Sequence, residues 1–213
     1  MSTQTFCTGN SVVAIRYNNG TLIASDKALS YGKMSLSTNF SRIFTTATTA
    51  IAFSGDEAHF RSTVDIIQQI ERDNRRLDRA ALTPEQIHRV VQEQHYAARN
   101  EQKPVLNSLI VTGKNFLQTI DVFGTVFSLN VASTSLGKYY ALPFLREQYR
   151  ENLTKAEAID IAKRALSIMY QNDCLACQNI EICTIGDQVE RFQEKVDCNW
   201  DIGKYRDLSV VMK

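Results

Sequence analysis

The chain contains 213 residues, with 24 Lys and Arg side chains against 23 Asp and Glu, so its formal net charge is +1. Hydrophobic residues make up 44% and charged residues 22%, which is typical of a single globular domain and argues against a nucleic-acid-binding protein with a basic excess. The N-terminus lacks a basic segment followed by an apolar core, and no apolar run reaches the roughly 18 to 20 residues that span a bilayer. We therefore expect a protein of the cytoplasm and nucleus, with no nucleic-acid or membrane partner.

The cysteine and histidine patterns predict neither a disulfide framework nor a metal site. Five cysteines are an odd number, and in a reducing compartment they are expected to be free thiols. Cys174 and Cys177 form a lone C-x-x-C without two further zinc ligands, so small buried thiols are preferred over metal or redox use. His88 and His95 lie seven residues apart on one predicted helical face, and we expect them at the surface or in an interface. No cofactor is predicted.

In the N-terminal half, residue periodicity predicts three strands and two helices. Strands over 11–17 and 21–25 are expected to pair antiparallel through Asn18-Asn19-Gly20, because Asn-Gly tolerates positive φ. Their interiors are apolar on both faces, which indicates sheets that are covered on each side. A strand over 50–54 precedes a helix that begins near Asp56, and Thr83-Pro84-Glu85-Gln86 is an N-cap, proline and capping box opening a second helix.

The C-terminal half continues with strands, helices and strands again. Three strand-like runs should form a meander, and two helices should follow them, the second opened by the capping box Thr154-Lys155-Ala156-Glu157. Two last strands meet around Gly186-Asp187, and the tail begins at Asp197. The predicted bounds are 106–112, 116–123 and 125–132 for the meander, 139–149 for the first helix, and 179–185 and 188–195 for the last strands.

Three short segments share a spacing with a known family. Thr8-Gly9-Asn10-Ser11-Val12-Val13-Ala14-Ile15, Ile23-Ala24-Ser25-Asp26 and Phe40-Ser41-Arg42-Ile43 place sixteen residues from Asn10 to Asp26 and thirty-two from Asn10 to Arg42. This pattern resembles a proteasome β subunit. The resemblance implies an α+β fold, a four-layer αββα sandwich of the N-terminal-nucleophile hydrolase type. It also implies three parts, namely a short leader over 1–9 that is expected to be retained, a β-type domain over 10–196 and a C-terminal extension over 197–213.

The resemblance also implies that the catalytic chemistry has been removed. In active family members the residue after the glycine is a threonine that becomes the new N-terminus, supplying a hydroxyl and an amine of pKa about 7.7 to 8.0. Asn10 has no hydroxyl, and the self-cleavage after Gly9 uses that same hydroxyl, so the leader should stay attached. A lysine of the active family is replaced by Arg42, which stays charged because its pKa is above about 12. We expect Arg42 to form an ordinary ion pair with Asp26.

Four further positions correspond to the family's site by resemblance. Gly55 matches the glycine whose backbone N–H faces the developing oxyanion, although a turn glycine between strand and helix is an equally good interpretation. Ser135 lies nearest the active-site serine of a glycine-serine-glycine turn, but Leu136 replaces the second glycine. Asp173 matches an aspartate that the family follows three residues later with a serine, and Ala176 lacks that hydroxyl. The site is therefore predicted to be degenerate, with no catalytic residue.

The expected role is architectural. The chain most resembles the seventh, non-catalytic β type, in four segments: 8–13, 29–32, 103–111 and 199–201. That implies an inner-ring β subunit of the 20S core particle, a four-ring assembly of twenty-eight α- and β-type subunits that degrades proteins in the ubiquitin-dependent pathway. The tail should reach the opposite β ring through Trp200 and Tyr205. The alternatives are an active peptidase processed instead at Cys7, Thr8 or Ser11, and a stand-alone or homo-oligomeric relative.

Overall fold

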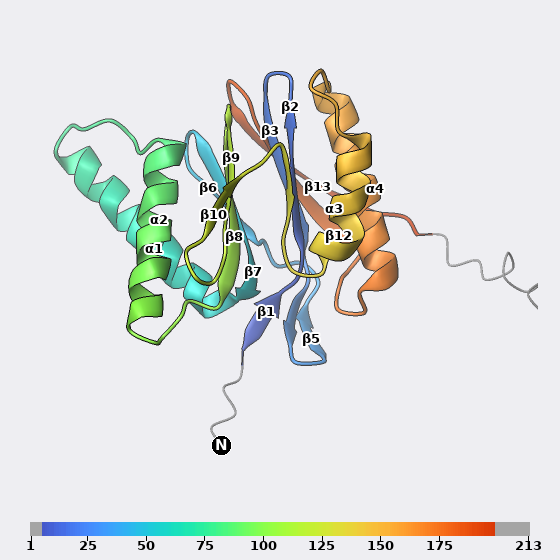
Figure 1. Ribbon diagram of the computed structural model, residues 1–213, viewed down its shortest axis with the longest axis horizontal. Coiled ribbons are helices and arrows are strands. Elements are labelled where there is room, and N and C mark those ends of the chain that lie inside the picture. The colour runs from blue at the N-terminus through green and yellow to red at the C-terminus, as the bar shows by residue number, and fades with distance from the viewer. Residues whose placement is uncertain (1–5, 199–213) are drawn as a thin grey trace, which may run out of the picture.

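The computed structural model describes residues 6–198, and these form four stacked layers. Two antiparallel sheets face each other, and a pair of helices covers the outer face of each sheet (Figure 1). One outer layer consists of α1 (Glu57–Arg76) and α2 (Pro84–Asn100), and the other of α3 (Gly137–Gln148) and α4 (Lys155–Asn172). The predicted αββα sandwich is confirmed. Trp200 and Tyr205 of the predicted tail lie outside the described residues.

The larger sheet, which packs against α1 and α2, contains eight strands within this part of the chain, in the order β10-β9-β8-β7-β1-β4-β5 with β6 also paired to β7. Its strands are β1 (Cys7–Gly9), β4 (Leu29–Tyr31), β5 (Met34–Ser37), β6 (Ile43–Thr45), β7 (Thr49–Asp56), β8 (Asn107–Gly113), β9 (Phe116–Ile120) and β10 (Val126–Ser128). The smaller sheet has the order β11-β2-β3-β12-β13. Its strands are β2 (Val12–Tyr17), β3 (Gly20–Asp26), β11 (Val131–Ser133), β12 (Asn179–Ile185) and β13 (Val189–Lys195).

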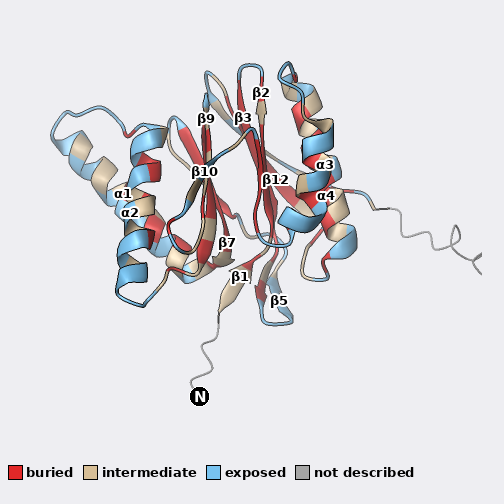
Figure 2. Ribbon diagram, in the orientation of Figure 1, coloured by how far each residue is buried: buried red, intermediate tan, exposed pale blue. Residues whose placement is uncertain are grey.

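Apolar side chains on both faces of the central strands produce the layering. On β2, Val13 and Ile15 join the core beneath α3 and α4, whereas Val12 and Ala14 join the core between the two sheets. A third apolar cluster, including Phe53 and Ile67, lies between the larger sheet and α1 and α2. The buried positions therefore run through the strands and along the inward faces of the helices (Figure 2). Strands that are buried on both faces are what the continuous apolar runs predict.

The helix starts follow the sequence closely. Thr83 accepts a hydrogen bond from the Gln86 N–H while the Gln86 side chain accepts from the Thr83 N–H, so the predicted capping box of α2 is formed. Thr154 and Glu157 form the same reciprocal pair at the start of α4. The Asp56 carboxylate caps α1 by accepting from the His59 N–H at 3.1 Å. Each cap supplies partners for N–H groups that have none within the helix.

The first hairpin is present, but the physical reason given for its turn was wrong. Tyr17 pairs with Gly20, so the two turn residues are Asn18 and Asn19, and neither has a positive φ. Gly20 is needed for a different reason, because an added Cβ would lie 2.0 Å from the carbonyl oxygen of Ile185 on the neighbouring strand β12. The glycine therefore allows two strands to approach closely.

One other strand prediction needs correction, and one strand was not predicted. The run over 125–132 is not one strand: β10 pairs with β9 in the larger sheet, and the chain then crosses to the smaller sheet, where β11 pairs with β2. Residues 7–9, assigned above to the leader, form β1 inside the larger sheet. Three-residue strands such as β1, β4 and β6 are too short to carry a periodic signal.

The predicted location of the histidines, at the surface or in an interface, is also wrong. His88 and His95 are 5% and 0% exposed, and they lie on the buried face of α2. The His88 ring meets the edge of Phe116, while Nδ1 of His95 lies 2.9 Å from the carbonyl oxygen of Asp121. Helical spacing places both rings against the sheet, because they share the face that carries Ile87 and Val91.

The cysteines are all free, but they are less uniformly buried than predicted. Cys177 and Cys183 are buried, Cys7 and Cys198 are half-buried, and Cys174 is exposed. Between residues 6 and 198, no group of three or more His, Cys, Asp or Glu side chains is arranged to hold a metal ion. Across the same residues, no helix has both the length and the apolar character needed to cross a bilayer.

Candidate functional site

Asn10 lies between β1 and β2, where the chain passes from the larger sheet into the smaller one. It is half-buried, and its side-chain Nδ2 is buried without a hydrogen-bond partner among the residues described. Its backbone carbonyl accepts a hydrogen bond of 2.6 Å from Nη1 of Arg42. The position predicted to have lost the nucleophile is thus held through its main chain.

Arg42 is fully buried and forms the centre of the site. Its Nη2 pairs with Oδ1 of Asp26, so the predicted ion pair is confirmed. The guanidinium also donates to four backbone carbonyl oxygens: Asn10 at 2.6 Å, Asp26 at 3.0 Å, Ser11 at 3.1 Å and Phe53 at 3.3 Å. Arginine can make this set of contacts because its five N–H donors form a rigid planar fork, which a lysine ammonium lacks.

The Asp26 carboxylate receives hydrogen bonds from three directions. Besides Arg42, the backbone N–H groups of Ala28 and Cys177 each donate to Oδ2 at 3.3 Å. Burial raises the pKa of Asp26, and the Arg42 guanidinium and the two N–H groups oppose that rise. A buried guanidinium requires a nearby anion, so the two groups stabilise each other in their charged forms.

Gly55 lies directly across from Gly9 in the pairing of β1 with β7. Its φ is +110°, and an added Cβ would lie 2.2 Å from the carbonyl oxygen of Leu106. It is the penultimate residue of β7, immediately before the N-cap Asp56 of α1. Glycine is therefore required here by backbone conformation and by packing, which accounts for the residue without a catalytic role.

The segment from Ser133 to Gly137 packs against the residue that follows Asn10. Ser135 is exposed and has a φ of +51°, so it forms the turn, but its neighbours make the contacts. The Gly137 N–H donates to Oγ of Ser11 at 2.9 Å, and Oγ1 of Thr134 accepts from the Val12 N–H at 3.0 Å. Residue patterns single out Ser135, whereas the structure shows that Ser11 and Thr134 bind the segment to the site.

Asp173 ends α4 and begins the loop that reaches Asp26. Its Oδ1 accepts from the Leu175 N–H at 3.0 Å, and its carbonyl oxygen accepts from the Ala176 N–H at 3.1 Å. This turn places the next residue, Cys177, so that its N–H reaches the Asp26 carboxylate. Ala176 contributes no side-chain polar group. The predicted site residues Asn10, Asp26 and Arg42 are therefore brought together, and Cys177 and Phe53 join them through backbone groups that carry no side-chain signal in the sequence.

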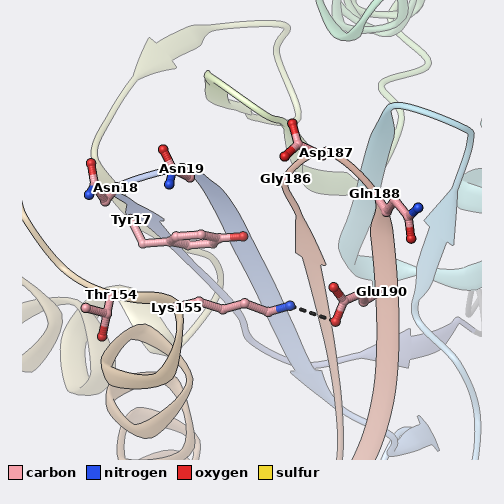
Figure 3. A pocket seen from close by; sticks show the side chains of 9 residues that line it. All are labelled: Tyr17, Asn18, Asn19, Thr154, Lys155, Gly186, Asp187, Gln188 and Glu190. Carbon is pink, nitrogen blue, oxygen red and sulfur yellow. Dashed lines mark hydrogen bonds and ion pairs between the residues drawn. The ribbon is translucent and has the colours of Figure 1, made fainter.

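Several surface pockets lie elsewhere. One, of about 530 Å³, is formed by the turn at Asn18 and Asn19, the turn around Asp187 and the start of α4. Figure 3 shows Lys155 extending across it to Glu190, an ion pair of 2.6 Å. A second pocket, of about 380 Å³, lies between α1 and the segment around Phe44. Neither is lined by a residue predicted for the catalytic site.

The chain matches a known protein family over most of its length. The family model described as proteasome subunit covers residues 7–185. A probable proteasome subunit beta type-7 of Encephalitozoon cuniculi is 30% identical, over 97% of this chain and 98% of that protein. Proteasome subunit beta type-4 of Xenopus laevis is 28% identical over 92% of this chain and 85% of its own length, and beta type-7 of Saccharomyces cerevisiae is 26% identical over 94% and 83%. This chain belongs to the proteasome subunit family, among its β-type members.

Proposed function

We propose that the chain is a non-catalytic structural β subunit of the 20S proteasome core particle. One observation carries the proposal. At the position of the family's nucleophile, Asn10 has no hydroxyl group, and the N–H groups of Arg42 donate to Asp26 and to backbone carbonyl oxygens. Among residues 6–198, no group at this centre pairs an attacking oxygen with a second group that can take its proton, which nucleophilic catalysis requires. The relatives named beta type-7 support the same assignment.

In this role the chain occupies an inner β ring and contacts other α- and β-type subunits in a four-ring particle. Its neighbours carry out the hydrolysis of proteins that arrive through the ubiquitin-dependent pathway, in the cytoplasm and the nucleus. The extension after Asp197, with Trp200 and Tyr205, contacts the opposite β ring. Aromatic side chains of this kind are common anchors at protein interfaces.

Mass spectrometry of the native particle tests the proposal. A covalent probe for threonine proteases should label the active subunits in the same sample, which are the internal positive control, and leave this chain unlabelled. The intact mass should correspond to a chain that still contains Gly9 and Asn10. Labelling of this chain, or a new N-terminus at Cys7, Thr8 or Ser11, supports the alternative of an active peptidase and contradicts the proposal.

Size-exclusion chromatography of the same sample tests the assembly. The chain should elute with other proteasome subunits in a particle of the full core size. Elution alone or as a homo-oligomer contradicts the assignment to a heteromeric ring.

A further inference from the structure

The leader strand β1 is the link that joins two parts of the larger sheet. On one side Thr8 and Gly9 pair with Asp56 and Gly55 of β7, and on the other Cys7 and Thr8 pair with β4. The hairpin of β4 and β5 has no other strand pairing to the sheet within residues 6–198. Removing β1 would therefore separate this hairpin from β7.

Arg42 occupies the edge of β7 next to β1. Strand β6 pairs with Ala50 to Ala52 of β7, and β1 pairs with Gly55 and Asp56, so Phe53 falls between the two pairings. The Phe53 carbonyl oxygen accepts from Nη1 of Arg42 instead. The arginine thus continues the hydrogen bonding of the sheet across the position where one strand ends and the next begins.

Gly9 completes this arrangement by its lack of a side chain. A Cβ added to Gly9 would lie 2.4 Å from Cδ of Arg42 and 3.1 Å from Nη1. The guanidinium is held by the Asp26 carboxylate and by four backbone carbonyl oxygens, so moving it away from an added Cβ would break some of these hydrogen bonds. The β1 backbone and the arginine therefore fit against each other only when residue 9 is glycine.

We propose that Gly9 and Arg42 form a lock that keeps the leader strand in the sheet, and that the leader is a required structural element which holds the β4–β5 hairpin in place. The lock positions an apolar edge of this hairpin, because Tyr31, Met34 and Leu36 are all more than one-third exposed. The Gly9–Asn10 peptide bond lies inside the locked segment, with the Asn10 carbonyl bound by Arg42. Cleavage there by another protease would need local opening of the strand, because proteases act on opened segments.

The test compares amide hydrogen exchange of residues 29–37 in the full chain within the assembled particle, for wild type, Gly9→Ala and Arg42→Lys. Both variants should exchange at least tenfold faster over 29–37, while peptides over 179–185 keep the wild-type rate. Gly186→Ala is the matched control, because an added Cβ there meets nothing closer than 3.3 Å, and Gly186 follows β12 of the smaller sheet whereas β1 belongs to the larger one. If Arg42→Lys accelerates exchange everywhere, Gly9→Ala alone decides the question.

The outcomes separate this inference from the proposed function on which it rests. Unchanged exchange over 29–37 in Gly9→Ala overturns the lock, even where the intact mass shows an uncut chain and the non-catalytic role stands. A wild-type chain that begins at Asn10 contradicts both. An uncut wild type, together with faster exchange in the variants, supports both.

Discussion

Replacing Asp26 with asparagine tests whether the buried ion pair stabilises the fold. The substitution keeps the size and shape of the side chain, and within residues 6–198 it removes the only carboxylate that contacts the Arg42 guanidinium. Arg42 is 0% exposed, so water cannot replace the lost anion. Breaking a buried pair by removing one partner costs about 3–5 kcal/mol.

The structure places the expected cost at the lower end of that range. The guanidinium keeps its hydrogen bonds to the carbonyl oxygens of Asn10, Ser11 and Phe53, and these dipoles continue to solvate the charge. We expect Asp26→Asn to lower the free energy of unfolding by about 3 kcal/mol. For a chain of this size that corresponds to a decrease in Tm of roughly 6–12 °C.

Urea and thermal unfolding of the full-length chain measure the effect. The matched control is Glu93→Gln, which removes the carboxylate of an exposed helical pair with Arg89 and should cost no more than about 0.5 kcal/mol. A loss below about 1 kcal/mol for Asp26→Asn would refute the reasoning. It would mean that burial, which raises the pKa of Asp26, leaves the carboxyl uncharged in the folded state.

Three further changes test other parts of the structure. Asn10→Thr alone should give no self-cleavage and no probe labelling, because Arg42 remains charged, and an intact mass that loses residues 1–9 would contradict this. Burial, aided by nearby Arg89, lowers the pKa of His88 to about 4. The neutral His88 ring therefore contributes fully to the free energy of unfolding above about pH 6.5, and up to about 3 kcal/mol of that free energy is lost as the pH falls toward 4. The variant His88→Gln should show a weaker dependence of the free energy of unfolding on pH. Thr83→Ala should cost about 1 kcal/mol in urea unfolding, since it removes the N-cap of α2, and a change within error would show that the cap is dispensable.

The elements that the sequence predicted well have local causes. The capping boxes at Thr83 and Thr154 predicted the starts of α2 and α4, because each pairs residues three positions apart. The apolar runs of β2 and β3 predicted strands buried on both faces. The Asp26–Arg42 pair followed from residue chemistry together with the family spacing.

The features that the sequence did not predict depend on distant parts of the chain. Three residues of β1 form a strand only because β4 and β7 lie on either side of them. The break at Leu129 and Asn130 separates two strands that belong to different sheets, and the composition of the run gives no sign of it. The N–H of Cys177 and the carbonyl of Phe53 reach the site through the backbone, which is the same in every residue type apart from proline.

Arginine in place of lysine at position 42 removes a group that could release a proton, and it adds a cross-link between neighbouring segments. A lysine there could release a proton when buried, but its single nitrogen could not reach the carbonyl oxygens of Asn10, Ser11 and Phe53 together with Asp26. Arginine cannot release the proton, and its planar fork reaches all of these groups at once. The same property that removes the side chain from proton transfer therefore makes it a cross-link between β3, β7 and the segment that joins β1 to β2.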